Sequence, residues 1–178
     1  NKMQLTIVPS QFTKEVFERT AKRHNKTITT DIQVVSEYFD ETTYDDKNVT
    51  TDVSGIDQQV KESFAFLSVG EDRKNISGVI HCFFNTFKNK KNKPALIIKT
   101  SGATYSVTDR MSIEKKINEI RHIFPKNTIL PSIYLLHGDL TNKEMNALYN
   151  HPKIKAMVSF TKAEGFGRPL LFYYAALL

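Results

Sequence analysis

The sequence predicts an α/β fold with a parallel sheet and helices on both of its faces. Short apolar segments of strand length alternate along the chain with longer segments in which apolar residues recur at helical spacing. This alternation is typical of parallel strands joined by right-handed helical crossovers. Polar loops follow the apolar segments, at the edge where open sheets of this class bind their ligands.

The first predicted elements are a strand and a helix near the N-terminus. Residues 5–8 are apolar, and apolar side chains then recur at helical spacing over residues 12–20. Ser10 precedes this helix and is a suitable N-cap. Residues 29–54 are rich in Thr and Asp, so we expect a crossing strand at residues 32–35 and a long interdomain loop.

Four further strands and three helices are expected before residue 161. The predicted strands occupy residues 64–70, 94–100, 133–138 and 156–160. The predicted helices occupy residues 76–87, 112–123 and 142–149. Ser112 is a suitable N-cap for the second of these helices, and Thr141 with Glu144 fits a capping box at the start of the third.

The elements divide the chain into three predicted parts. Residues 1–28 form the end of one domain, residues 29–62 an interdomain segment, and residues 63–178 a second domain truncated at its C-terminus. The chain starts without Met and ends inside an apolar, helix-like run. We therefore expect it to be a fragment of a longer polypeptide.

Composition narrows the class of protein. Hydrophobic residues make up 40% of the chain and charged residues 25%, as in ordinary soluble globular proteins. No apolar run approaches the roughly 20 residues that a membrane-spanning helix needs, and the N-terminus lacks the pattern of a signal peptide. Cys82 is the single cysteine, which favours a reducing compartment and hence the cytoplasm. Its apolar neighbours predict a buried side chain.

The chain is basic, with a formal net charge of +6. Part of the excess is one lysine-rich run at residues 88–93, which could bind nucleic acid or an anionic surface. No aromatic residues interleave with these lysines to stack on bases. We interpret the run as a solvated loop and expect no nucleic-acid partner. The five histidines lack ligand spacing, so we expect no metal site.

The most informative segment is residues 157–171. It reads as an apolar strand, a loop with two glycines, and the first turn of a helix. Pro169 suits a helix start because its missing N–H would have no partner there. Free N–H groups at such a start can hold a phosphate. With Glu164 and Arg168 flanking the loop, the segment predicts a phosphate or nucleotide-sugar site.

Residues 159–171 resemble the signature of retaining glycosyltransferases with the GT-B fold, in which two glutamates are separated by seven residues. The resemblance extends over residues 64–171, with a weaker match at residues 7–20. It implies the C-terminal, donor-binding, Rossmann-like half of a GT-B fold, preceded by the tail of the N-terminal domain. Residues 142–152 are also similar to a pattern in glycosyltransferases of large phages and viruses. That subgroup would add the host cytoplasm or the virion as a location.

The resemblance implies an enzyme that transfers a sugar from a nucleotide diphosphate sugar to an acceptor hydroxyl with retention, as a hexosyltransferase does. The nucleotide sugar would be the donor substrate, and no metal or other cofactor is implied. Glu164 would be the catalytic residue, bonding the donor sugar or stabilising positive charge on its ring. The donor phosphates would be bound by Arg73, Lys74, Gly165, Phe166 and Gly167. The nucleotide would be bound by Gly70, Lys99, His137, Gly138 and Arg168.

Several of these residues also have a structural interpretation. Arg73 and Lys74 are expected in an exposed loop and could simply precede a helix. Lys99 could extend its ammonium group from a strand end to water. His137 alone more often serves structure, and Glu164 could be an exposed loop acid or a partner for Arg168.

One position departs from the family signature. The second glutamate, which holds the ribose hydroxyls in the family, would fall at residue 172, where this chain has Phe172. The departure removes the carboxylate that would hold the ribose and favours an alternative, a non-catalytic GT-B-like sugar-binding or structural protein. A basic nucleic-acid-binding module is a second alternative, supported only by the net charge.

Overall fold

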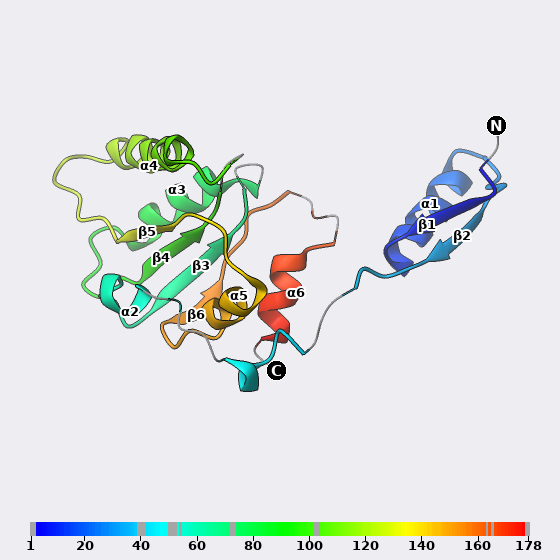
Figure 1. Cartoon of the computed structure of the whole chain (residues 1–178). Helices are drawn as coiled ribbons and strands as arrows, with labels where there is room; N and C mark the ends of the chain where they lie inside the picture. Colours follow the sequence, from blue (N-terminus) through cyan, green and yellow to red (C-terminus); the bar gives the residue numbers. More distant parts are fainter. Residues whose placement is uncertain are drawn as a thin grey trace. The chain divides into compact units, whose positions relative to one another are not determined.

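A computed structural model describes residues 3–38, 42–49, 53, 55–71, 74–101, 104–162, 164 and 166–176. The chain forms two compact units, Asn1–Asp40 and Glu41–Leu178 (Figure 1). The boundary between them falls within the predicted interdomain segment. Each unit is described by itself below.

The first unit contains strand β1 (Leu5–Val8), helix α1 (Gln11–Arg23) and strand β2 (Asp31–Val34). The two strands pair in parallel. The Ser10 side chain accepts a hydrogen bond from the N–H of Thr13 at 3.1 Å, so the predicted N-cap is confirmed. The crossing strand is also confirmed, beginning one residue earlier than expected.

The second unit contains a four-stranded sheet in the order β5-β4-β3-β6, with all neighbouring strands parallel. Its strands are β3 (Ala65–Val69), β4 (Ala95–Lys99), β5 (Ile133–Leu136) and β6 (Ile154–Met157). Its helices are η1 (Asp46–Asn48), α2 (Ile56–Gln59), α3 (Ile76–Phe87), α4 (Val107–His122), α5 (Asn142–Tyr149) and α6 (Arg168–Ala175). The predicted α/β fold is confirmed.

The helices cover both faces of this sheet. Helices α3 and α4 lie on one face, and α2, α5 and α6 lie on the other (Figure 1). The first face has a buried core in which Ile80 and Phe84 of α3 and Ile117 of α4 pack with Leu96 and Ile98 of β4. Within the described parts of the chain, every helix is too short or too polar to serve as a membrane span.

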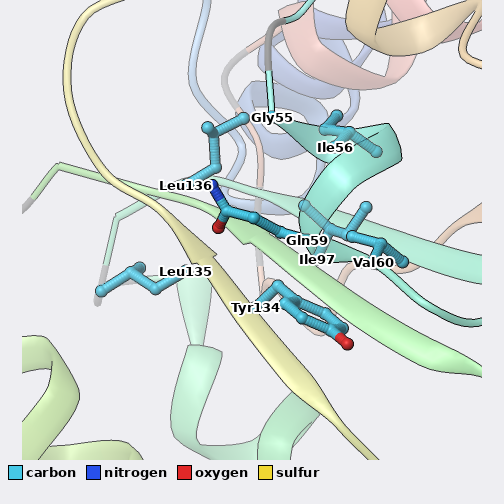
Figure 2. A pocket seen from close by; sticks show the side chains of 8 residues that line it. All are labelled: Gly55, Ile56, Gln59, Val60, Ile97, Tyr134, Leu135 and Leu136. Atoms are coloured by element: carbon cyan, nitrogen blue, oxygen red, sulfur yellow. The ribbon is translucent and has the colours of Figure 1, made fainter.

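On the second face, α2 lies over β4 and β5 (Figure 2). A hollow of about 40 Å³ remains between them, and no charged side chain lines it. Its lining residues are Gly55, Ile56, Gln59, Val60, Ile97, Tyr134, Leu135 and Leu136. Its small size and largely apolar lining make it a packing gap under α2.

Several predicted element boundaries are wrong. Helix α4 begins at Val107, so its N-cap is Ser106, and the predicted cap Ser112 lies inside the helix. The apolar periodicity is weak in the first turns, where Val107 and Met111 are exposed. Strand β6 begins at Ile154, two residues before the predicted start, and ends at Met157, three residues before the predicted end.

The expected burial of Cys82 is also wrong, because its side chain is exposed. Helix α3 buries Ile76, Ile80 and Phe84 against the sheet. Cys82 is two positions after Ile80, which at 3.6 residues per turn places it on the opposite side of the helix. Its apolar neighbours in sequence therefore belong to another face.

Candidate functional site

The loops predicted to meet at the carboxyl ends of the strands are directly connected. The backbone N–H of Gly70, after β3, donates to the carbonyl of Lys99, at the end of β4, at 3.1 Å. The ammonium of Lys99 donates to the carbonyl of Gly138, after β5, at 2.5 Å. Lys74 forms an ion pair with Glu164, after β6, with Nζ and Oε1 2.9 Å apart. The four loops therefore form one edge, as expected for parallel strands.

Lys74 is buried, which corrects the expectation of an exposed loop residue. Only 7% of the residue is exposed. A buried ammonium is tolerated when a carboxylate compensates it, and Glu164 supplies that carboxylate. The partner that the structure gives Glu164 is thus Lys74, where the sequence suggested Arg168. The ion pair joins the loop that follows β3 to the loop that follows β6.

Gly70 makes room for the Lys74 side chain. Its φ angle is +147°, a conformation that residues with side chains rarely adopt. A Cβ atom at this position would lie 2.4 Å from Cδ of Lys74. The glycine therefore allows the lysine stem to cross directly against the backbone of the loop.

The backbone of Lys74 is held by a hydrogen bond just before the start of α3. The N–H of Lys74 donates to the carbonyl of Glu71 at 2.9 Å. The next residue, Asn75, caps α3 by accepting a hydrogen bond from the N–H of Gly78 at 3.2 Å. The preceding cation of the predicted pair, Arg73, lies outside the described residues.

Lys99 is anchored inside this edge of the protein. It is the last residue of β4, and 8% of it is exposed. Burial lowers the pKa of Lys99, and the nearby carboxylate of Asp139 partly opposes that shift. Because its ammonium binds the Gly138 carbonyl, Lys99 ties the ends of β4 and β5 together.

His137 has a structural partner. Its Nε2 atom lies 3.1 Å from Oδ2 of Asp109, and 6% of the His137 side chain is exposed. Asp109 lies in the first turn of α4. Asp109 was not among the predicted site residues, because the sequence predicted a later start for that helix. This contact supports the structural interpretation of His137.

A cavity of about 250 Å³ lies beyond the carboxyl ends of β3 and β4. Its lining includes Gly70 and Lys99, which the sequence predicted. It also includes Glu71, Thr100, Ser101, Asp139 and Leu140, which lie in the polar loops that the sequence predicted to follow the strands at the ligand-binding edge, together with Val69 and Met145. Val69 is the last residue of β3 and Met145 lies on α5, so neither belongs to a loop that follows a strand. No sequence pattern indicated these two residues.

Helix α6 begins beside the ion pair. Gly167 is its N-cap, and Pro169 lies in its first turn as predicted. Phe166 is half-buried and Arg168 is exposed. Gly165 lies outside the described residues. Only three positions separate Glu164 from the N-cap, so its carboxylate lies close in sequence to the N-terminus of the helix.

Phe172 packs within the protein. Its ring stacks on that of Tyr44, a residue with 5% exposure. The Tyr44 hydroxyl donates to Oδ1 of Asn142, the first residue of α5, at 3.3 Å. Position 172, where the family has its second glutamate, therefore joins α6 to the segment that precedes α2.

The site combines lysine ammonium groups, carboxylates and backbone groups. Among the residues that the structure describes, no three His, Cys, Asp or Glu side chains gather closely enough to bind a metal ion.

Solved structures share this fold. An E. coli structure described as trehalose-6-phosphate bound with UDP-2-fluoro glucose matches 97% of this chain and 43% of its own, with a TM-score of 0.69 and 12% identity. An α,α-trehalose 6-phosphate synthase from Burkholderia multivorans matches 97% and 42%, with a TM-score of 0.66 and 11% identity. A UDP-forming α,α-trehalose-phosphate synthase from Burkholderia vietnamiensis matches 97% and 44%, with a TM-score of 0.64 and 10% identity.

The chain spans less than half the length of each of these proteins. At such identities the likeness concerns the fold, which corresponds to the Rossmann-like C-terminal half of a GT-B protein. No protein-family model matches the sequence, and no curated protein is similar to it in sequence.

Proposed function

We propose that this chain is the donor-binding part of a glycosyltransferase that moves a sugar from a nucleotide diphosphate sugar to an acceptor hydroxyl. The observation that carries the proposal is the Lys74–Glu164 ion pair, held between two loops at the carboxyl edge of a parallel sheet. A cavity lies at the same edge and shares Gly70 with the surroundings of Lys74. Structural neighbours include UDP-forming synthases, which supports a nucleotide donor.

The chemistry of transfer requires positive charge at this edge. When the bond between the anomeric carbon and the diphosphate breaks, negative charge grows on the leaving phosphate oxygen. Lys74 would meet that charge, with Arg73 beside it in sequence. The N-terminus of α6 would add backbone N–H groups from the loop of Gly165, Phe166 and Gly167. In this arrangement no metal is needed to balance the leaving group.

Glu164 would act on the sugar side of the bond. Its carboxylate would accept a hydrogen bond from a donor hydroxyl or stabilise the positive charge that develops on the sugar ring. Lys74 keeps this carboxylate in place before the donor binds. Retention of configuration and a hexose donor are further parts of the proposal, and they follow from the resemblance of residues 159–171. The phage or viral subgroup and the cytoplasmic location stay predictions from the sequence.

A second candidate function is a non-catalytic sugar- or nucleotide-binding protein of the same fold. The packing of Phe172 against Tyr44 favours it, because a phenyl ring accepts no hydrogen bond from ribose. The two candidates differ in turnover, while both can bind a nucleoside diphosphate. Hydrolysis of a nucleotide sugar separates them, since only the enzyme releases sugar from the donor.

The test of the shared site is calorimetric titration with UDP, GDP and ADP. We expect heat of binding with at least one of them, and a weak dependence on salt. A site that binds the nucleic-acid backbone would instead lose affinity steeply as salt increases. Lys143→Ala, an exposed residue of α5, is the control for loss of one positive charge. Absence of binding to all three nucleotides at millimolar concentration would overturn the proposal.

A further inference from the structure

A second charged surface lies at the opposite edge of the sheet. The loop between α3 and β4 and the loop between α4 and β5 meet there, at the amino ends of the two strands. The N–H of Asn89 donates to the carbonyl of Ile129 at 2.8 Å. The N–H of Ile129 donates to Oδ1 of Asn89 at 2.9 Å. These two bonds join the loops, and we call residues 88–93 with residues 121–132 the basic loop pair.

The basic loop pair carries positive charge and contains no carboxylate that could neutralise it. Neither segment contains Asp or Glu. Its positively charged residues are Lys88, Lys90, Lys91, Lys93, Arg121 and Lys126, of which all but Lys93 are exposed. A hollow of about 520 Å³ lies in the second loop, with Arg121, His122 and Lys126 on its walls. The first loop contributes to the same place, because Nζ of Lys88 lies 5.6 Å from the ring centroid of Phe124, another lining residue.

Exposed aliphatic side chains accompany these cations. Ile123 is 67% exposed and Ile129 is 62% exposed, and both belong to the second loop. Large aliphatic groups at the surface gain little from a partner that is charged throughout, such as a nucleic-acid backbone. They gain more where an anionic layer covers an apolar one, because the cations then meet headgroups while the aliphatic groups enter the boundary with the acyl chains. Phe124, the aromatic residue of the pair, is half-buried and so is poorly placed to stack on bases.

We propose that the basic loop pair docks the protein reversibly on the surface of an anionic phospholipid bilayer. The lysines and Arg121 contact the phosphate-bearing headgroups, and Ile123 and Ile129 insert at the interface. Each basic residue near the bilayer surface adds to the electrostatic attraction, and added salt weakens this attraction. The docking surface is at the amino ends of the strands, so the candidate site at their carboxyl ends stays open to solution. The lysine-rich run, interpreted from the sequence as a solvated loop, thus has a binding role.

Co-sedimentation of the whole chain with vesicles tests this proposal. We expect binding to vesicles of equimolar phosphatidylcholine and phosphatidylserine at low salt, and little binding to phosphatidylcholine alone. Lys88→Glu combined with Lys126→Glu should weaken partitioning by about tenfold or more. The matched control is Lys143→Glu with Lys155→Glu, which changes the net charge equally at exposed residues of α5 and β6. The control should bind like the unmodified protein.

The aliphatic part of the proposal is tested by Ile123→Ser with Ile129→Ser, which leaves the charge unchanged. This variant should also lose vesicle binding, while far-ultraviolet circular dichroism shows that it is folded. Absence of binding to the anionic vesicles, or equal loss in the charge control, would overturn the proposal. So would unchanged vesicle binding by the isoleucine variant. Tighter binding of single-stranded RNA than of vesicles, unaffected by the isoleucine changes, would reassign the surface to nucleic acid.

Discussion

Phe172 stacks on Tyr44 with ring centroids 4.3 Å apart and ring planes inclined by 17°. The two residues are far apart in sequence, and the contact joins the last described helix to the segment before α2. Stacked aromatic pairs contribute about 0.5–1.5 kcal/mol beyond the area they bury. The contact gives Phe172 a structural role at a position where the resembling enzymes have a carboxylate.

The first prediction compares Phe172→Glu with Phe172→Leu. Both should lower the free energy of unfolding by roughly 1 kcal/mol or more, because both remove the stack on Tyr44. Only the glutamate can accept hydrogen bonds from ribose hydroxyls, so only Phe172→Glu should also bind UDP more tightly. Chemical denaturation and calorimetry with UDP measure the two effects. Robust donor hydrolysis by the unmodified protein, unaffected by Phe172→Glu, would show that ribose is held elsewhere.

The second prediction concerns the Lys74–Glu164 ion pair. Lys74→Met should destabilise the protein by up to about 3 kcal/mol, because it leaves a largely buried carboxylate without its partner. Lys74→Met with Glu164→Gln should recover much of that loss, since no lone charge is left. UDP affinity should decrease about ten- to a hundredfold in both variants, as a charge-assisted hydrogen bond is lost. Unchanged UDP affinity in the stable double variant would mean that Lys74 serves only structure.

The third prediction concerns Gly70. Gly70→Ala should destabilise the protein by about 1–3 kcal/mol, because it combines an unfavourable φ angle with a clash against the Lys74 stem. Gly138→Ala is the matched control: its φ is +121°, but a Cβ there would have no atom within 4 Å. Gly138→Ala should therefore show only the loss of stability that comes from the unfavourable φ angle. In Gly70→Ala with Lys74→Ala the clash is gone, so the two effects should be less than additive. If the stability losses of Gly70→Ala and Lys74→Ala were strictly additive, the close approach of the Lys74 stem to Gly70 would be contradicted.

The fourth prediction is a pH dependence that depends on Glu62. Burial raises the pKa of this carboxyl, but hydrogen bonds from Ser132, the backbone and Tyr134 outweigh it, so the pKa lies below its usual 4.5. A lowered pKa stabilises the folded state above the usual value, and this contribution disappears as the pH decreases through the folded-state pKa. Glu62→Gln should therefore flatten the decrease in unfolding free energy below about pH 5. Tyr134→Phe removes one of these bonds and should flatten it partly. If both variants lost stability in acid as the unmodified protein does, this role of Glu62 would be contradicted.

The fifth prediction uses the corrected start of α4. Ser106→Ala should cost about 1 kcal/mol, because the Ser106 hydroxyl accepts the N–H of Asp109 at 3.1 Å. Ser112→Ala should be neutral or slightly stabilising, because alanine is the better residue within an exposed helix. Thermal unfolding of the two variants gives the comparison. A larger loss at Ser112 would restore the boundary that the sequence predicted.

Local patterns explain how much of the fold the sequence could predict. The strand at Leu5–Val8, the helix at Ile76–Phe87 and the capping box of Thr141 and Glu144 depend on neighbours within one or two turns, and all three are confirmed. The grouping of the loops also follows, since parallel strands bring their carboxyl ends to one edge. Weak amphipathicity at the start of α4 removed the usual signal, so its first turns were missed.

Contacts between residues that are far apart in the chain could not be predicted from the sequence. Lys74 and Glu164 are 90 positions apart, and nothing local indicates that their charges meet or that Lys74 is buried. The same holds for His137 with Asp109, and for Phe172 with Tyr44. In each case the partner is set by how helices pack around the sheet, which a periodic pattern does not specify.

Tyr44, Tyr149, Phe172 and Tyr173 form an aromatic cluster. The ultraviolet absorbance of its tyrosines reports how this part of the protein packs. The sequence has no tryptophan, so tyrosine dominates the near-ultraviolet signal. Tyr149 is 1% exposed, and its ring centroid lies 6.2 Å from that of Tyr44 and 5.9 Å from that of Tyr173. Burial raises the pKa of the Tyr149 phenol, so this ring should form tyrosinate only at a pH above the usual range for a tyrosine. Tyrosinate absorbance during alkaline titration would thus follow whether the segment of Tyr44 is seated on α5 and α6, without any attached label.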